Sequence, residues 1–127
     1  MVRGIGIDIL EIARVGKSID DLGEAFLQRV FTRGEIAYCS ARANRNQHFA
    51  ARFAAKEAVS KALATGWSGE FAWRDVEIVN APSGQPMVTL HGKLAHRLIG
   101  CAIHLSLSHS QDHVVAMAVI DGPPEPS

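Results

Sequence analysis

The sequence has 127 residues, of which 47% are hydrophobic and 20% are charged, and thirteen basic residues balance thirteen acidic ones. This length accommodates a single domain, and the composition excludes a largely disordered chain. Nucleic-acid-binding proteins usually carry a marked basic excess, so a net charge near zero gives that function no support. No apolar run approaches the roughly 20 residues needed to cross a bilayer, and residues 1–4 do not resemble a signal peptide. We therefore expect neither a nucleic-acid partner nor a membrane partner.

Cysteine usage and the composition of the C-terminus point to a small intracellular domain with a short tail. Cys39 and Cys101 are far apart and form no Cys-x-x-Cys pair, which indicates neither a zinc site nor a disulfide framework. A reduced, cytoplasmic protein is therefore expected. Residues 121–127 contain three prolines and no core residue, so we expect a disordered tail after a single domain over residues 1–120.

The first half of the chain predicts a strand followed by helices. Isoleucines alternate with glycines over residues 2–12, which favours a β-strand. Between residues 19 and 42, apolar side chains recur every three or four positions in a broken helical pattern. Thr32 and Glu35 stand three residues apart like the two members of a capping box, so a helix should begin there. The strongest helix spans residues 48–65, which are rich in alanine and end just before a glycine.

Strand patterns dominate the second half of the chain. Residues 67–90 are β-like around a loop of proline, serine and glycine, which predicts a hairpin. Residues 92–99 indicate a short helix. Residues 103–108 alternate apolar and polar side chains, and residues 114–120 form an apolar closing strand. We therefore predict an α+β domain in which an antiparallel sheet packs on the long alanine-rich helix.

Asp8 stands out because its carboxylate interrupts an apolar strand. A buried carboxylate is costly unless it is paired, hydrogen-bonded or bound to a metal ion. An aspartate that faces solvent at the strand edge is an alternative of at least equal weight.

The alanine-rich helix carries two pairs of charged residues at a spacing of four. Glu57 and Lys61 have the orientation of an ordinary surface ion pair, which is the simpler interpretation of these two residues alone. Arg52 and Lys56 repel each other slightly, so an anion between them, such as a phosphate, would stabilise both.

The polar face of the strand near residue 106 is a third candidate. His104, Ser106 and Ser108 share that face, and His109 follows at the end of the strand. Hydroxyl groups and a histidine in this position can hold a phosphate, although a solvated sheet face is the more common alternative. No Gly-x-Ser-x-Gly sequence surrounds the serines, which argues against a serine nucleophile.

Together these features suit a reaction at a phosphate or diphosphate group. Asp8 and Glu57 supply two carboxylates, and Mg²⁺ is commonly held by one or two carboxylates together with substrate phosphates and waters. The metal ion and nearby cations would neutralise the charge of the reacting group. The candidate partners for the phosphates are four basic residues: Arg52, Lys56, Lys61 and His109.

Six stretches of the sequence carry a resemblance to a known family. They are GIGIDILEIARV at 4–15, RVFTRGEIAYC at 29–39, ARFAAKEAVSKAL at 51–63, WRDVEI at 73–78, GQPMVTLHG at 84–92 and HLSLSHSQDHVVAMAVI at 104–120. In this order they resemble the holo-acyl-carrier-protein synthase family, the short 4′-phosphopantetheinyl transferases of bacteria. The resemblance covers nearly the whole chain except the tail, and it implies the fold of that family.

The resemblance implies transfer of the 4′-phosphopantetheine group from coenzyme A to a serine of an apo acyl-carrier protein, with release of adenosine 3′,5′-bisphosphate. It implies that Asp8 and Glu57 bind a Mg²⁺ ion that bridges the diphosphate of coenzyme A. Lys61 matches a motif lysine beside the diphosphate, where it could steady the leaving oxygen or donate a proton to it. The general base is either Glu57 or a water on the metal ion.

The same resemblance assigns residues to coenzyme A binding. His109 matches the histidine of the SLSH motif and resembles a contact to a coenzyme A phosphate, with Ser106 and Ser108 as weaker candidates. Arg52 is implied to meet the phosphates of the nucleotide. Such sites commonly lie between neighbours in a homotrimer, so the two metal ligands would come from one subunit and His109 from the next.

The first helical region resembles the surface on which this family docks its acidic carrier protein. Arg14, Lys17 and Arg29 are expected to pair with carrier carboxylates, and Phe26 is expected to fill an apolar pocket. Three acidic residues depart from the usual pattern and dilute the positive charge of this surface: Asp20, Asp21 and Glu24.

Two other functions compete with the transferase. One is a non-catalytic module of the same fold that binds coenzyme A or a nucleotide, and the other is a purely structural oligomer. The binding module would be favoured by replacement of Asp8, Glu57 or Lys61, and all three are present. The structural oligomer leaves the carboxylate in the apolar strand unexplained.

Overall fold

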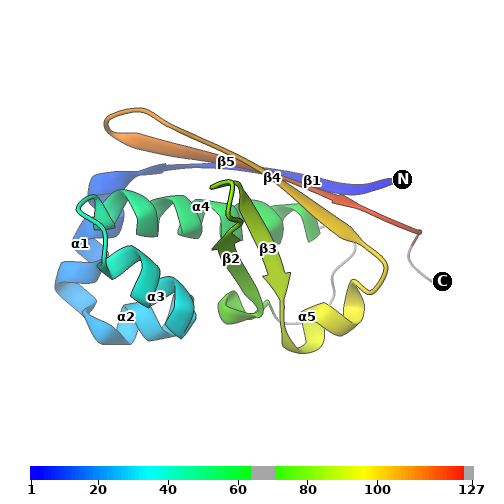
Figure 1. Cartoon of the computed structure of the whole chain (residues 1–127), viewed down its shortest axis with the longest axis horizontal. Helices are drawn as coiled ribbons and strands as arrows, with labels where there is room; N and C mark the ends of the chain where they lie inside the picture. Colours follow the sequence, from blue (N-terminus) through cyan, green and yellow to red (C-terminus); the bar gives the residue numbers. More distant parts are fainter. Residues whose placement is uncertain (64–70, 125–127) are drawn as a thin grey trace.

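A three-stranded antiparallel sheet and one long helix form the centre of the molecule. The structure is a computed structural model, and it describes residues 1–63 and 71–124. The strand order is β1–β5–β4, with the bounds Val2–Glu11, His113–Asp121 and Ala102–His109. Helix α4 (Arg45–Leu63) covers one face of this sheet and packs mainly on β1 and β5 (Figure 1). The predicted α+β class with antiparallel pairing is confirmed.

A second layer covers the opposite side of α4. It contains a hairpin in which β2 (Val76–Asn80) pairs with β3 (Pro86–Leu90), and a group of short helices (Figure 1). The short helices are α1 (Ile12–Leu22), α2 (Glu24–Val30), α3 (Arg33–Ser40), the 3-10 turn η1 (Trp73–Asp75) and α5 (Gly92–Arg97). The molecule thus has three layers with α4 in the middle.

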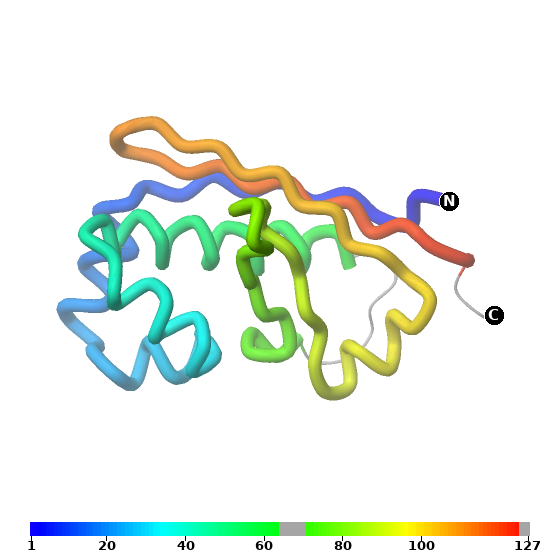
Figure 2. Tube along the Cα trace, in the orientation of Figure 1, coloured from blue at the N-terminus to red at the C-terminus, as the bar shows by residue number. Residues whose placement is uncertain are grey.

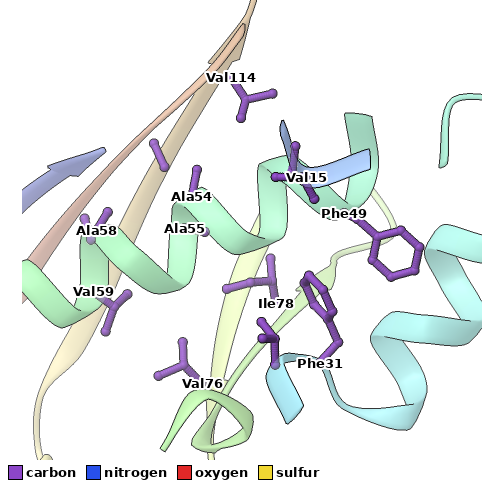
Figure 3. Close-up of a cluster of buried hydrophobic side chains, with 14 of the residues drawn as sticks. Val15, Phe31, Phe49, Ala54, Ala55, Ala58, Val59, Val76, Ile78 and Val114 are labelled. Carbon is purple, nitrogen blue, oxygen red and sulfur yellow. The ribbon is translucent and has the colours of Figure 1, made fainter. Parts of the chain in front are cut away.

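Helix α4 is buried on nearly all sides because it lies between these two layers. Ala54 and Ala58 face the strands, whereas Val59 points away from the strands toward Val76 of the hairpin (Figure 3). The sequence predicted apolar residues on one side only. The second buried side was not foreseen because it carries long polar side chains, among them Lys56.

Two glycines of β1 allow the closest approach between strand and helix. A Cβ atom on Gly4 would lie 2.0 Å from the carbonyl oxygen of Ala62, and one on Gly6 would lie 1.9 Å from that of Ala58. Only glycine leaves room for a backbone at this distance. The alternation of glycine and isoleucine in β1 therefore separates a face that touches α4 from a face that does not.

The helix starts show which local signals the sequence carries. Helix α3 begins with the predicted capping box, since Thr32 Oγ1 accepts from the Glu35 N–H at 3.2 Å and Glu35 Oε1 accepts from the Thr32 N–H at 2.9 Å. Helix α1 begins at Ile12, whereas the sequence pattern predicted helical structure only from residue 19. That prediction was wrong for two reasons. Ile12 continues the run of β-branched residues of the strand, and the N-cap residue Glu11 makes no side-chain cap hydrogen bond that would mark a helix start.

The ends of several predicted segments differ from the structure. Helix α4 begins at Arg45 instead of residue 48. The last two residues of the predicted helix, 64–65, and the first residues of the predicted hairpin, 67–70, lie outside the described residues. Strand β5 includes Asp121, the first residue of the predicted tail, because Asp121 pairs with Val2 across the sheet. Figure 2 shows the last strand running beside the first strand along the sheet. The N-H of Gly122 also donates to the Met1 carbonyl at 2.9 Å. Residues 125–127 of the predicted tail lie outside the described part of the chain.

Candidate functional site

Strand β1 and helix α4 bring Asp8, Glu57 and Lys61 together at an edge of the sheet. Asp8 lies on the same face of β1 as the two glycines, because side chains alternate along a strand, and this face packs on α4. Lys61 Nζ lies 2.9 Å from Asp8 Oδ1 and donates to the Ile7 carbonyl at 3.1 Å. Glu57 stands one helical turn before Lys61. We name these three residues the carboxylate site.

The carboxylate site suits an oxygen-liganded cation. Asp8 Oδ2 is buried and has no hydrogen-bond partner, which is costly in the absence of a ligand. Burial raises the pKa of Glu57, the negative charge of Asp8 raises it further, and Lys61 opposes both. Within residues 1–63 and 71–124, no three His, Cys, Asp or Glu side chains gather as a metal cluster. Many Mg²⁺ sites nevertheless have only one or two carboxylates as protein ligands, and substrate phosphates and waters complete the coordination.

A cavity of about 420 Å³ opens between α4, the β2–β3 hairpin and β4. Its walls include Arg52 from α4, Asn80 and Pro86 from the hairpin, and Ser108 and His109 from the end of β4. This volume is in the range of pockets that hold a small-molecule ligand. We name it the α4–hairpin cavity.

Arg52 is held rigidly in the wall of the α4–hairpin cavity. Its side chain is 5% exposed, Nη2 donates to Asn80 Oδ1 at 2.7 Å, and the guanidinium lies 4.3 Å from the centre of the Tyr38 ring. Its Nε is buried without a hydrogen-bond partner. Sequence reasoning missed Asn80 and Tyr38 as the residues that fix this arginine, because both come from elements distant in the sequence.

Among the described residues that line the α4–hairpin cavity there is an arginine and no carboxylate, so positive charge predominates there. Burial lowers the pKa of His48 in its wall, and the positive charges of Arg52, Arg42 and His109 lower it further. His109 and Ser108 are exposed at the end of β4, where an incoming ligand can reach them. A guanidinium beside a cavity favours an anionic ligand such as a phosphate.

The carboxylate site and the α4–hairpin cavity lie on opposite sides of α4. Arg52 and Lys61 are nine residues apart, which is two and a half helical turns, so their side chains point in opposite directions. The contacts agree, since Arg52 bonds to the hairpin and Lys61 to β1. One chain therefore gathers the predicted site residues into two separate groups.

Lys56 belongs to neither group. Its side chain is fully buried, and its ammonium lies 2.7 Å from Glu35 Oε1 and donates to the carbonyls of Val76 at 2.6 Å and Trp73 at 3.0 Å. The spacing from Arg52 predicted a shared phosphate, and for Lys56 that prediction was wrong. Its partner is a carboxylate from α3, and helical spacing within α4 carries no information about such a contact.

The predicted docking residues lie on α1 and α2. Arg14 and Arg29 are exposed, whereas Lys17 is exposed but paired with Asp21 of its own helix at 2.5 Å. Phe26 is half-buried and makes edge-to-face contacts with two other phenylalanines. Part of its ring therefore packs in the core, and a role of Phe26 in docking stays a prediction.

The chain shares its sequence with a known family over nearly its whole length. Residues 4–118 match the model of the 4′-phosphopantetheinyl transferase superfamily. The holo-[acyl-carrier-protein] synthase of Koribacter versatilis is 44% identical over 124 residues, which cover 95% of this chain and 99% of that protein.

Solved structures of similar proteins have the same fold. A holo-(acyl-carrier-protein) synthase from Bacillus anthracis in complex with CoA (3′,5′-ADP) matches with a TM-score of 0.79 and 34% identity, over 97% of this chain and 99% of its own. The Helicobacter pylori holo-[acyl-carrier-protein] synthase in complex with coenzyme A matches with a TM-score of 0.79 and 33% identity, over 92% of this chain and 99% of its own. The chain therefore belongs to the 4′-phosphopantetheinyl transferase superfamily and, within it, to the holo-[acyl-carrier-protein] synthases.

Proposed function

We propose that this protein transfers the 4′-phosphopantetheine group from coenzyme A to a serine of an apo acyl-carrier protein in a Mg²⁺-dependent reaction. The observation that carries the proposal is the carboxylate site, where a buried, unpartnered oxygen of Asp8 faces a helix that bears Glu57 and Lys61. Family membership supplies the substrates, since similar proteins have been solved with coenzyme A or 3′,5′-ADP.

The reaction exchanges one phosphorus–oxygen bond for another. The serine hydroxyl attacks the phosphorus on the pantetheine side of the diphosphate, the bond to the bridging oxygen breaks, and adenosine 3′,5′-bisphosphate leaves. The hydroxyl proton passes to a base, for which Glu57 and a water molecule in the site are the two candidates. Lys61, which is half exposed, places a positive charge beside the leaving oxygen.

Asp8 and Glu57 would hold the Mg²⁺ ion. When bound, the metal ion neutralises charge on the diphosphate and makes its phosphorus more electrophilic. The salt bridge from Lys61 leaves one oxygen of Asp8 without a partner, so the carboxylate can serve both the lysine and a cation.

The α4–hairpin cavity would hold the adenosine 3′,5′-bisphosphate half of coenzyme A. Arg52 supports this assignment, because a guanidinium locked in the wall loses little entropy when it binds a phosphate. Ser108 and His109 at the rim would add hydrogen bonds to the same ligand.

We infer that the complete site forms between neighbours of a homotrimer. A single chain presents the two groups on opposite sides of α4, and one coenzyme A molecule must meet both. Ile5, Ile7 and Ile9 on the outer face of edge strand β1 are 62%, 59% and 64% exposed. An apolar row on a sheet edge of this kind marks an interface in a stable protein. Adjacent copies could then supply one group each.

Further features fit the carrier partner and the cellular compartment. Arg14, Lys17 and Arg29 on the first two helices would meet the acidic carrier, with Phe26 as the apolar contact. No helix in the described ranges is both long and apolar enough to cross a membrane. Cys39 and Cys101 are free thiols, which fits the reducing cytoplasm.

The intact mass of an apo acyl-carrier protein tests the proposal. The carrier is incubated with this protein and coenzyme A, with added Mg²⁺ in one sample and excess chelator in the other. We expect a gain of one phosphopantetheine group that the chelator abolishes and that excess Mg²⁺ restores. Binding of coenzyme A without any mass gain, across several carriers, would support the non-catalytic binding module instead.

A further inference from the structure

Glu35 and Lys56 form an ion pair that is completely removed from solvent. Both side chains are 0% exposed, and the Lys56 ammonium has three acceptors: the Glu35 carboxylate and the carbonyls of Val76 and Trp73. Glu35 in turn accepts from the N–H of Ile78 at 2.8 Å and caps its own helix. This pair takes no part in the reaction described above.

The pair joins four elements at one point. Lys56 comes from α4 and Glu35 from α3, and their backbone partners lie in η1 and at the start of β2. A second contact reinforces the junction, because the Thr32 hydroxyl donates to Glu77 of β2 at 2.6 Å. The base of the hairpin is therefore fixed to α4 and α3 through its backbone.

The far end of the same hairpin forms a wall of the α4–hairpin cavity. Asn80 at the end of β2 holds the Arg52 guanidinium, and Gly84 and Pro86 line the cavity beyond it. Arg52 and Lys56 are one helical turn apart on α4. The hairpin thus meets α4 at two points, one at its base and one at the wall of the cavity.

Stability is a weak explanation for an ion pair in this place. Burying two charges carries a desolvation penalty, and an apolar or neutral pair of similar volume is often equally or more stable. What the buried pair adds is geometric, because Lys56 keeps the Val76 carbonyl as an acceptor, and Glu35 keeps the Ile78 N–H as a donor, only while the hairpin sits in one position.

We propose that Glu35 and Lys56 are positioning residues for nucleotide binding, which act by fixing the β2–β3 hairpin against α4 and thereby holding Arg52 in the cavity wall. The identity of the ligand rests on the proposed function. The positioning role rests on the contacts of the described residues alone.

The test uses the neutral double variant Glu35→Gln/Lys56→Met, which leaves no unpaired charge in the core. Titration calorimetry measures its affinity for adenosine 3′,5′-bisphosphate, and kinetics measure KM for coenzyme A and for the carrier. We expect nucleotide affinity to fall about tenfold and the KM for coenzyme A to rise to match, with the carrier KM within about twofold of wild type. Lys93→Met, at an exposed lysine of α5, is the matched control and should change none of these values.

A double-mutant cycle separates positioning from a general loss of structure. If the pair acts through Arg52, then neutralising it in an Arg52→Ala background should weaken nucleotide binding by less than about threefold. The same tenfold loss in both backgrounds would overturn the proposal. So would wild-type nucleotide affinity in a folded double variant, or an equal rise of both KM values.

A milder variant keeps the proposal testable if the double variant does not fold. Glu77→Ala removes the hydrogen bonds to Thr32 and His91, together with a negative charge near Lys56, but leaves the buried pair in place. It should weaken nucleotide binding several-fold without changing the carrier KM. Unchanged nucleotide affinity in Glu77→Ala would then count against the proposal. If instead the proposed function is wrong, the wild-type protein transfers no phosphopantetheine, while these variants still weaken its binding of the nucleotide.

Discussion

Gly6 of β1 lies against Ala58 of α4 so closely that a Cβ atom on the glycine would sit 1.9 Å from the Ala58 carbonyl oxygen. Real Cβ atoms do not approach a backbone oxygen to this distance, so strand or helix would have to move. Asp8 follows two residues later on the same face, opposite Lys61. The packing of two backbones therefore sets the geometry of the carboxylate site.

Gly6→Ala should destabilise the fold and disturb catalysis together. The obstructing atom belongs to the helix backbone and cannot rotate away, so we expect a loss of about 1–3 kcal/mol or more in the free energy of unfolding. Urea denaturation measures this loss. Gly16→Ala of α1 is the control, because its new Cβ atom would meet only the end of the Asn46 side chain, which can rotate away. Equal losses in the two variants would show that close packing is not what requires glycine at position 6.

Local features of the fold were predictable from the sequence. The capping box of Thr32 and Glu35 was recognisable because both partners lie within one helical turn. The alternation in β4 was recognisable because Leu105 and Ser106 fall on opposite faces of one strand. Both patterns depend on contacts between residues that are close in sequence.

Long-range features were not predictable in the same way. The burial of Lys56 depends on Glu35, which is contributed by another helix, and nothing in the spacing within α4 indicates it. The separation of the site into two groups follows from helical geometry, but it becomes apparent only once Arg52 is seen to contact the hairpin and Lys61 to contact β1. The motif resemblance named most of the candidate site residues, and the structure shows how these residues are arranged within one chain.

Asp8→Asn should abolish most Mg²⁺-dependent transfer while the fold survives. Asparagine has nearly the same shape but no charge, so the proposed metal loses a ligand and Lys61 loses its ion pair. A loss of about 3 kcal/mol of transition-state stabilisation corresponds to more than a hundredfold in kcat. Steady-state kinetics over a range of Mg²⁺ concentrations measure the effect, and thermal unfolding checks the fold. Turnover equal to that of the exposed-turn control Asp112→Asn would remove Asp8 from the metal site.

Ile7→Glu should dissociate the proposed homotrimer. Ile7 is 59% exposed on the outer face of β1, so a glutamate there leaves the single chain intact but places a charge in the proposed interface. Sedimentation velocity should detect a trimer for the wild type and a monomer for the variant. A wild-type protein that sediments as a monomer, or a variant that stays trimeric, would contradict this assembly.

Mixed assemblies test whether neighbouring chains share one site. Asp8→Asn and Arg52→Ala chains should each be nearly inactive alone, because each lacks one of the two groups. Co-expressed in equal amounts, they should regain about one quarter of wild-type activity, since random assembly pairs an intact carboxylate site with an intact cavity at that share of all interfaces. Mixed trimers without recovered activity would place both groups of each site in one chain.

Arg14→Glu should weaken carrier docking in a manner that depends on salt. Arg14 is exposed on α1, whereas Lys17 on the same helix is already paired with Asp21, so the arginine is the better cation for an acidic partner. We expect the carrier KM to rise about tenfold at low ionic strength and the difference to shrink as salt approaches about 0.5 M, with kcat nearly unchanged. An effect that is the same at every salt concentration would argue against an electrostatic role.

Glu77→Gln should lower stability at neutral pH but not in acid. Burial alone would raise the pKa of Glu77, but hydrogen bonds from Thr32 and His91, with the charges of His91 and Lys56, outweigh it and hold the pKa below its ordinary value of 4.5. The unfolded chain therefore binds this proton more readily than the folded chain does, so the stabilisation is present above pH 4.5 and is lost as the pH falls through the lowered pKa.

Urea midpoints of the wild type and Glu77→Gln, measured from neutral pH down to about pH 3, provide the readout for this group. The two midpoints should differ at neutral pH and converge in acid, as the wild-type carboxylate takes up its proton. Removing one of its partners with His91→Ala should reduce the difference at neutral pH. A difference that stays constant over the whole range would mean that the hydrogen bonds from Thr32 and His91 do not favour the charged form of Glu77, and that its carboxylate anchors the hairpin by shape alone.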